Sequence, residues 1–224
     1  MGLPENGPMT TDAHVPVVQA ERSALSDSLL TLGPDAPTLC DPWRARDLAA
    51  HLVLREHRPF LATGIWFAPL HDRMERGQAS IAAQGYPALV EQVRSGPPWW
   101  APTRLDAVDA VLNTTELVIH HEDVLRGDGR PGPRREVPAR TGRAVMVALK
   151  RSASLMFRRA GVQVRLVAPG AEPGTAGRGD STITVTGDPV ELLLLASGRM
   201  RVAAVELEGS PAAVETLRSA RLGV

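Results

Sequence analysis

The stretch NTTELVIHHED, residues 113–123, places histidine and carboxylate side chains inside a run that otherwise has the pattern of an amphipathic helix. Glu116 and His120 lie one helical turn apart, on the side that also carries Leu112 and Ile119. Positions i and i+4 of a helix are about 40° apart around its axis, so the two side chains project together. The spacing therefore indicates that Glu116 and His120 hold one metal ion from a single rigid turn.

A third ligand must come from another part of the chain. His51 lies in the middle of a second predicted helix, WRARDLAAHLVLREHRPF (residues 43–60), on a face that it shares with apolar side chains. Antiparallel helices of a bundle bring such positions together in the core. Two neutral imidazoles and a carboxylate suit Zn²⁺ or another borderline divalent ion, and three protein ligands leave the open position typical of a catalytic site. The sequence therefore predicts a metal site of His51, Glu116 and His120.

Each of these signals alone has a simpler explanation. A histidine on an apolar helix face, such as His51, is often a hydrogen-bonded core residue, and exposed helices often carry glutamate and histidine four positions apart. The coincidence on apolar faces favours the metal site, because unpaired polar groups there are costly. His121 points about 100° away from His120, so we expect it to be an outer residue of the site or a surface residue. It replaces His120 as a ligand only if the helix phase is shifted by one.

The other residues with reactive side chains carry weaker signals. We expect His57 and His71 to be solvated, because their surroundings are less apolar. Cys40 has no evident activating partner, so we expect a buried small side chain and not a redox thiol. A single cysteine forbids an internal disulfide and a cysteine-rich zinc cluster, and it fits a reducing cytoplasm.

Charge and hydropathy exclude several classes of partner. The 224 residues include 25 basic and 25 acidic side chains, so there is no excess positive charge to attract nucleic acid or a membrane surface. No segment has about 18 consecutive apolar residues, and the first residues lack the charged and apolar blocks of a signal peptide. We expect a soluble cytoplasmic protein, monomeric or homodimeric, with a flexible N-terminus over residues 1–14.

Helical periodicity comes first along the chain, and strand periodicity follows it. Five helices are predicted in the first part, over residues 15–32, 43–60, 86–96, 105–125 and 138–159. The sequence leaves open to which domain the fifth of them belongs. Two strands follow at 162–168 and 181–187, separated by a loop rich in glycine and proline, and then come a helix (188–199), a strand (202–209) and a final helix (210–223). This segregation predicts an α+β protein with two domains, residues 15–137 and 138–224.

The motifs PWRARDLAAHLVLREHRP (42–59) and NTTELVIHHEDV (113–124) resemble the metal-binding helices of the DinB-like superfamily, in particular its mycothiol-dependent maleylpyruvate isomerase type. The resemblance implies an N-terminal antiparallel four-helix bundle in which His51, Glu116 and His120 bind a divalent metal. The later strands and DPVELLLLASGR (188–199) resemble the small sterol-carrier-like α+β domain that accompanies the bundle.

One position departs from that family. Its second helix usually opens with Trp-Thr or Trp-Ser, whose hydroxyl caps the helix, whereas this chain has Trp43-Arg44. Asp47 still favours the helix N-terminus electrostatically, so only the start of the helix is in question.

The resemblance also implies a chemistry. An open metal position, most simply on Zn²⁺, binds a low-molecular-weight thiol such as mycothiol and lowers its pKa. The sulfur then adds to an electrophilic carbon, which gives either S-transfer or isomerisation. Arg55 and Arg199 are the arginines expected to bind the anionic cofactor or substrate, with ordinary surface or carboxylate pairing as the simpler explanation. Two alternatives stay open: a metal Lewis-acid enzyme of hydrolysis or cyclisation without thiol, and a non-catalytic metal-binding module.

Overall fold

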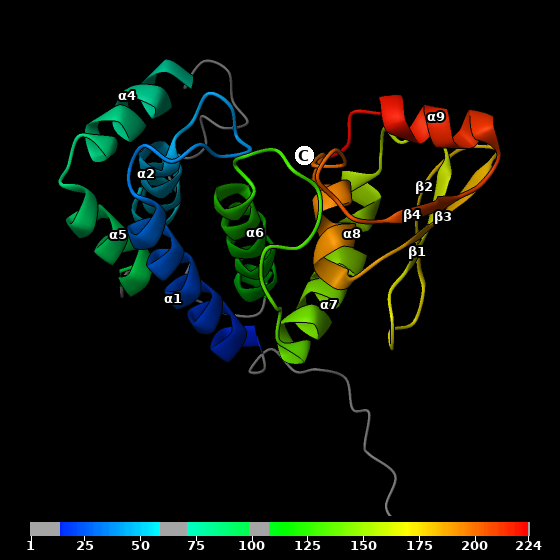
Figure 1. Cartoon of the computed structure of the whole chain (residues 1–224), viewed down its shortest axis with the longest axis horizontal. Helices are drawn as coiled ribbons and strands as arrows, with labels where there is room; N and C mark the ends of the chain where they lie inside the picture. The colour runs from blue at the N-terminus through cyan, green and yellow to red at the C-terminus, as the bar shows by residue number, and fades with distance from the viewer. Residues whose placement is uncertain (1–13, 59–70, 99–107, 224) are drawn as a thin grey trace, which may run out of the picture.

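The computed structural model describes residues 14–58, 71–98 and 108–223. Within these residues the chain forms eight helices and one four-stranded sheet, so the predicted α+β class is confirmed. Figure 1 shows α6 near the centre, with helices α1, α2, α4 and α5 on one side and α7, α8, α9 and the sheet on the other. No strand precedes residue 163 in the described part, where a single isolated bridge joins Pro37 and Arg44.

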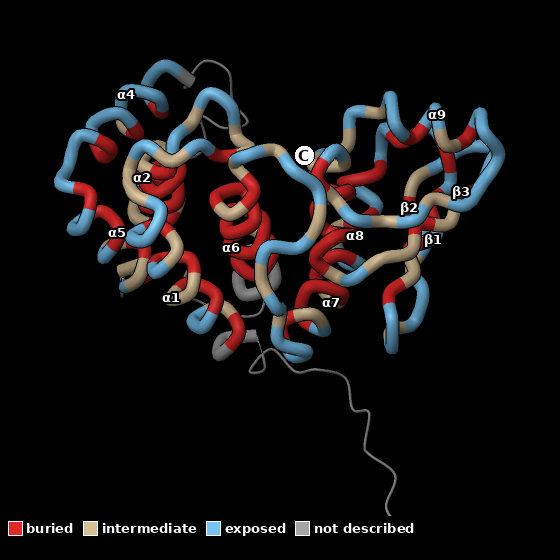
Figure 2. Tube along the Cα trace, viewed as in Figure 1, coloured by how far each residue is buried: buried red, intermediate tan, exposed pale blue. Residues whose placement is uncertain are grey.

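The helices of the first part pack around one apolar cluster. Helix α1 (His14–Leu32) lies against α6 (Val108–Leu125) and α5 (Tyr86–Ser95), and α2 (Ala45–His57) lies against α4 (His71–Ala82) and α5. The cluster is built from the inward faces of these helices and includes Leu25, Leu48, Leu52, Leu89 and Leu117. Figure 2 shows these buried faces turned toward one another. The packing fixes which faces of α2 and α6 meet, and thereby positions the site.

Helix α2 begins later than the tryptophan motif suggested. Its first residue is Ala45, and Arg44 is the N-cap. The backbone N–H of Arg44 donates to Oδ2 of Asp47 at 2.9 Å. This is the half of a capping box that the acidic residue supplies, and it satisfies a donor that would otherwise lack a partner. The loss of the capping hydroxyl is therefore tolerated, because Asp47 holds the helix start with a hydrogen bond as well as with its charge.

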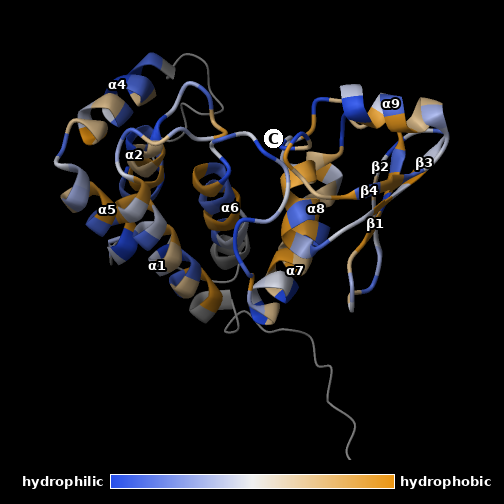
Figure 3. Cartoon of the chain, in the orientation of Figure 1, coloured by the Kyte–Doolittle hydropathy of each residue, from blue (hydrophilic) through white to orange (hydrophobic). Residues whose placement is uncertain are grey.

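The second part folds around a sheet of order β2-β1-β3-β4. Strand β1 (Gln163–Val167) pairs in parallel with β3 (Thr182–Thr186), whereas β2 (Gly174–Gly177) and β4 (Glu206–Glu208) pair antiparallel at the two edges. Burial alternates along β1 and β3, so one face of the sheet enters a core shared with α7 (Ala139–Met156) and α8 (Pro189–Ala196). Helix α8 is strongly hydrophobic (Figure 3), and α9 (Pro211–Ser219) contacts β3.

Two elements were not predicted from the sequence. Helix α4 has buried Met74 and Ile81, but the position between them on that face is Gln78, so the apolar period is interrupted. Strand β2 lies inside the segment predicted to be a loop. Two of its four residues are glycine, which is unfavourable in strands, so the sequence pattern does not indicate a strand, and β2 forms by pairing with β1. Strand β4 is shorter than predicted, because only Glu206–Glu208 of the expected residues 202–209 form it, whereas helices α8 and α9 lie within their predicted ranges. Residues 1–13, 59–60 and 105–107 of the predicted ranges lie outside those described.

Helix α6 belongs to both cores. Leu117 and Val124 lie in the cluster of the first part, whereas Val118 and Ile119 lie in that of the second. The domain limits 15–137 and 138–224 therefore stay a prediction, as do the four-helix bundle and the sterol-carrier-like domain. Among the described helices, none combines the length and the apolar composition needed to cross a membrane.

Candidate metal centre

The structure brings together the three residues predicted to bind metal. His51 projects from α2, and Glu116 and His120 project from α6, so that one ligand atom of each lies within 4.8 Å of the others. The two imidazole rings are nearly perpendicular with centroids 5.4 Å apart, and Nε2 of His120 lies 3.5 Å from Oε2 of Glu116. Both histidines are buried and the glutamate is half-buried. Two imidazoles and a carboxylate thus converge, the pair on α6 through its helical spacing and His51 through the packing of α2.

His51 is held as a neutral imidazole. Burial, and then the charge of His120, lower the pKa of His51 to about 4, so its ring keeps a free lone pair at neutral pH. The ring packs against Trp43 with centroids 5.0 Å apart. Gln78 of α4 lies close enough to favour the protonated ring slightly. Nδ1 of His51 and Oε1 of Gln78 are nevertheless both buried without a hydrogen-bond partner among the described residues.

His120 is oriented by a buried carboxylate. Its Nδ1 donates to Oδ2 of Asp123 at 3.0 Å, and the Asp123 side chain has no exposed surface. Burial opposes ionisation of Asp123, but His120 and Arg199 hold the pKa of this carboxyl well below its usual range. An ionised carboxylate only accepts hydrogen bonds, so the Nδ1 proton is fixed and Nε2 faces Glu116. A histidine held by a carboxylate in this way is the usual arrangement of a metal-binding imidazole.

Two carboxylates draw one positive charge to His120. Burial disfavours its charged form, but Asp123, Cys40 and Glu116 raise the pKa of His120 well above its ordinary value. Burial likewise opposes ionisation of Glu116, and the hydrogen bond and charge of His120, with Arg55, lower its pKa to about 2. The donor set fits a divalent cation, since a cation at Nε2 takes the place of the proton that the free site holds there.

A second trio, Cys40, His120 and Asp123, also lies within 4.8 Å. Its carboxylate is already occupied: Arg199 donates to both oxygens of Asp123, at 3.0 and 2.8 Å. A metal cation at this carboxylate would be repelled by the guanidinium, so this trio supports the site and does not compete with it. The expectation that Cys40 is buried without a partner is wrong, because its half-buried Sγ lies 3.1 Å from Oδ2 of Asp123.

Of the two arginines predicted to bind an anion, Arg55 contacts a member of the trio, and Arg199 contacts Asp123, the carboxylate that orients His120. Arg55 donates to Oδ1 of Asn113 at 2.8 Å and lies 3.7 Å from Oε2 of Glu116. Arg199 pairs with Asp123 and also donates to the carbonyl of Ser197 at 2.7 Å. Each is therefore engaged by a carboxylate of the site, and a role in binding an anionic ligand stays a prediction for both.

Two other histidines differ from their predictions. His121 is buried, with Nδ1 2.8 Å from Oε1 of Glu21 and Nε2 2.9 Å from Oγ of Ser28, so it is not a surface residue. His57 is half-buried, with Nε2 3.1 Å from the carbonyl of Gly96, and is not simply solvated. The side chain of His71 lies outside the part of the chain that the structure describes.

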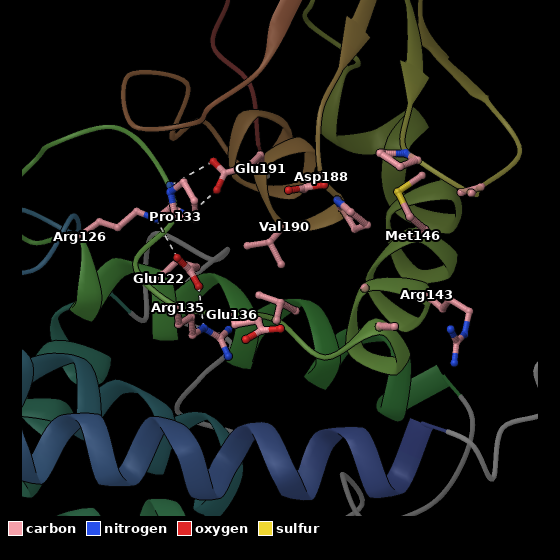
Figure 4. A pocket seen from close by; sticks show the side chains of 17 residues that line it. Glu122, Arg126, Pro133, Arg135, Glu136, Arg143, Met146, Asp188, Val190 and Glu191 are labelled. Carbon is pink, nitrogen blue, oxygen red and sulfur yellow. Dashed lines mark hydrogen bonds and ion pairs between the residues drawn. The ribbon is translucent and has the colours of Figure 1, made fainter.

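A cavity of about 520 Å³ lies away from these residues, between the segment after α6 and helices α7 and α8 (Figure 4). Arg126 donates to Glu122 at 2.7 Å and to Glu191 at 2.6 Å, and Arg135 donates to Glu122 at 2.8 Å. None of the five predicted site residues lines this cavity. The sequence analysis did not predict these ion pairs. The Arg126–Glu191 pair joins residues 65 positions apart, so no local period indicates it.

Comparison with known proteins identifies a fold. No protein-family model and no curated protein matches the chain. Among solved structures, the mycothiol-dependent maleylpyruvate isomerase aligns with 90% of this chain and 96% of its own, with a TM-score of 0.54 and 16% identity. A histidine-to-alanine variant of that enzyme aligns over the same shares with a TM-score of 0.55. At this identity the similarity establishes the fold, and the resemblance predicted from the sequence is confirmed at that level.

Proposed function

We propose that this chain is a metal-dependent enzyme that uses a low-molecular-weight thiol, mycothiol or a close analogue, for S-transfer to or isomerisation of a small electrophilic substrate. The observation that carries the proposal is the convergence of His51, Glu116 and His120 within 4.8 Å, with His120 oriented by a buried carboxylate. The fold supports it, since the aligned enzyme is by its name a mycothiol-dependent isomerase. The proposal includes a four-helix bundle over residues 15–137 and a sterol-carrier-like domain over 138–224.

In this proposal His51, Glu116 and His120 hold a divalent metal, with Zn²⁺ the best match to the donor set. A bound metal would lower the pKa of a thiol that coordinates it. The protein's residues do the rest: Asp123 fixes the tautomer of His120, and Trp43 covers one side of His51. Arg55, beside Glu116, and Arg199, beside Asp123, attract an anionic substrate. In isomerisation the thiolate sulfur would add to one carbon of a double bond, and after rotation about the resulting single bond it would leave as thiolate. In S-transfer the sulfur would remain, and either a proton adds to the neighbouring carbon or the substrate's leaving group departs with the electron pair.

The test is spectroscopic. In the Co²⁺-substituted protein, mycothiol or cysteine should produce a new sulfur-to-cobalt charge-transfer band, and the same additions should leave the His51→Ala protein unchanged. Turnover of maleylpyruvate or monochlorobimane should then require both thiol and metal. If no thiol perturbs the cobalt spectrum anywhere from about pH 6 to about pH 9, across the usual thiol pKa, the thiol mechanism is wrong and the Lewis-acid alternative takes its place.

Gln78 offers a test of the metal trio from a neighbouring helix. Metal-binding histidines almost always donate their second N–H to an acceptor, and Oε1 of Gln78 is the unpartnered buried acceptor beside His51. We expect Gln78→Met, which keeps the volume and removes the acceptor, to weaken metal binding by about 10–100-fold. Gln78→Glu keeps the acceptor and should bind at least as tightly as the parent. Chelator competition measures both affinities.

The matched control is Gln92→Met on α5, because the Gln92 side chain bonds only to Gln84 in the described structure. Its metal affinity should equal that of the parent. Equal losses in the Glu and Met variants of Gln78 would mean that the residue acts through packing alone.

A further inference from the structure

A second constellation lies on the other side of α6. Oγ of Ser28 is 2.9 Å from Nε2 of His121, and Nδ1 of His121 is 2.8 Å from Oε1 of Glu21. Ser28 and Glu21 come from α1, and His121 comes from α6. A hydroxyl, an imidazole and a carboxylate are thus joined in the order that activates a serine nucleophile, and such a set is recognised by its geometry and not by its place in the sequence.

The carboxylate of Glu21 orients the imidazole of His121. Glu21 is buried, and although burial opposes ionisation, His121 and Arg135 lower the pKa of its carboxyl. The ionised carboxylate only accepts hydrogen bonds, so the Nδ1–H of His121 donates to Glu21 and the other ring nitrogen, Nε2, faces the Ser28 hydroxyl. Arg135 donates to both oxygens of Glu21, at 2.6 and 3.0 Å, and fixes the carboxylate while offsetting part of its charge.

The hydroxyl of Ser28 differs from its neighbours on α1. Ser26 and Thr31 each donate to the carbonyl four residues earlier, as hydroxyls inside helices commonly do. Ser28 lies instead with its hydroxyl at hydrogen-bond distance from the imidazole of His121. Its side chain is half-buried, whereas that of Ser26 is fully buried. Ser28 therefore combines access with a base.

Space for a substrate lies next to it. Ser28, His121 and Glu21 all line a cavity of about 410 Å³. Ala20, Ala24, Leu125 and Pro138 supply apolar walls, and Asp27, Glu136 and Arg140 add charges. The α1 residues of the wall run from Ala20 to Ser28, nine positions that extend along about 12 Å of helix.

The first turn of α7 borders the same cavity through Arg140 and Thr141. No side chain among the described residues caps this end of the 18-residue helix, and its first turn contains no acidic residue. The first N–H groups of a helix lack partners inside it and carry partial positive charge. This end of the cavity therefore favours negative charge, such as that developing on a carbonyl oxygen.

The geometry points to a second active site, in which Ser28 is the nucleophile, His121 the base and Glu21 the residue that orients it, acting on small carboxylic esters with a short apolar acyl chain. The site goes beyond the proposed thiol chemistry and uses none of the residues of the metal trio.

The reaction balances with water as the only co-reactant. Oγ of Ser28 bonds to the ester carbonyl carbon, and its proton moves to Nε2 of His121. The carbonyl re-forms as the bond to the leaving oxygen breaks, and the His121 proton passes to the departing alkoxide. Water then repeats the sequence on the acyl-serine, which releases the carboxylic acid and restores the Ser28 hydroxyl.

The test treats the full chain with a fluorophosphonate probe and maps the modified peptide by mass spectrometry. We expect one adduct, on Ser28, and with p-nitrophenyl acetate a burst of about one equivalent of p-nitrophenolate per chain. Ser28→Ala should give neither. His121→Gln should slow labelling by about 100-fold or more, because the base is lost. Ser26→Ala is the matched control and should label at the parent rate.

Because peptide mapping uses the unaltered protein, the result does not depend on the folding of any variant. Absence of an adduct on Ser28 overturns the proposal, and so does equal labelling of the parent and the His121→Gln protein. A chelator should leave the labelling rate unchanged, whereas labelling that requires metal would also overturn it. Loss of thiol activity in the cobalt experiment has no bearing on this site, so the two proposals fail separately.

Discussion

His120→Ala is expected to reduce tightly bound divalent metal from about one equivalent per chain to none, because the variant keeps only two of the three ligands that an open catalytic site requires. His120 is also the ligand that Asp123 orients at 3.0 Å. The loss of affinity should therefore exceed the 10–100-fold that removal of an outer partner causes. His51→Ala and Glu116→Ala should have the same result. Elemental analysis of protein purified without a polyhistidine tag measures the metal content directly.

His57→Ala is the matched control, since His57 interacts with the carbonyl of Gly96 and not with the trio. It should retain the parent's metal content. His71→Ala is expected to do the same. A protein in which His51, Glu116 and His120 are all replaced, and which still holds a full equivalent of metal, would show that the metal lies elsewhere.

Arg126→Met is expected to lower the free energy of unfolding by about 3–5 kcal/mol, because it leaves the buried carboxylate of Glu191 without its cation and removes one of the two arginines that pair with Glu122. The Arg126 side chain is 1% exposed and lies between Glu122 and Glu191, which are also buried. It also donates to the carbonyl of Val202 at 2.9 Å. The loss is a large fraction of the stability of a typical domain. Urea denaturation, followed by circular dichroism, measures it.

Two variants sharpen this test. Arg130→Met should leave the urea midpoint unchanged, because Arg130 is exposed and its ion pair is a surface contact. Adding Glu191→Gln to Arg126→Met should recover part of the loss, since a neutral amide removes one buried charge. The amide oxygen still accepts the N–H of Ala204, which Glu191 accepts at 2.7 Å in the parent. A loss of less than about 1 kcal/mol in Arg126→Met would contradict the expectation that this charge is essential.

Local periodicity accounts for much of the agreement between the prediction and the structure. The helices α1, α5 and α7 end near their predicted limits, and Gly33 and Gly96 follow α1 and α5 with positive φ, as glycines at helix ends commonly do. Such features depend on neighbouring residues and are therefore readable in one chain. Helix α4 is the exception, because Gln78 faces inward where an apolar residue would have revealed the helix.

The sequence by itself determined that Glu116 and His120 project together, because four residues make almost one turn of any helix. It also placed His51 on an inward face, since the apolar period of its helix does so. Only the tertiary structure decided that Arg199 donates to Asp123, and that His121 joins Ser28 and Glu21 at a separate cavity. These contacts join residues 76 to 100 positions apart in the chain. Such contacts depend on how each helix is rotated about its axis and how closely the helices pack against one another. A local period in the sequence indicates which face of a helix is apolar, but not which residues of two packed faces meet.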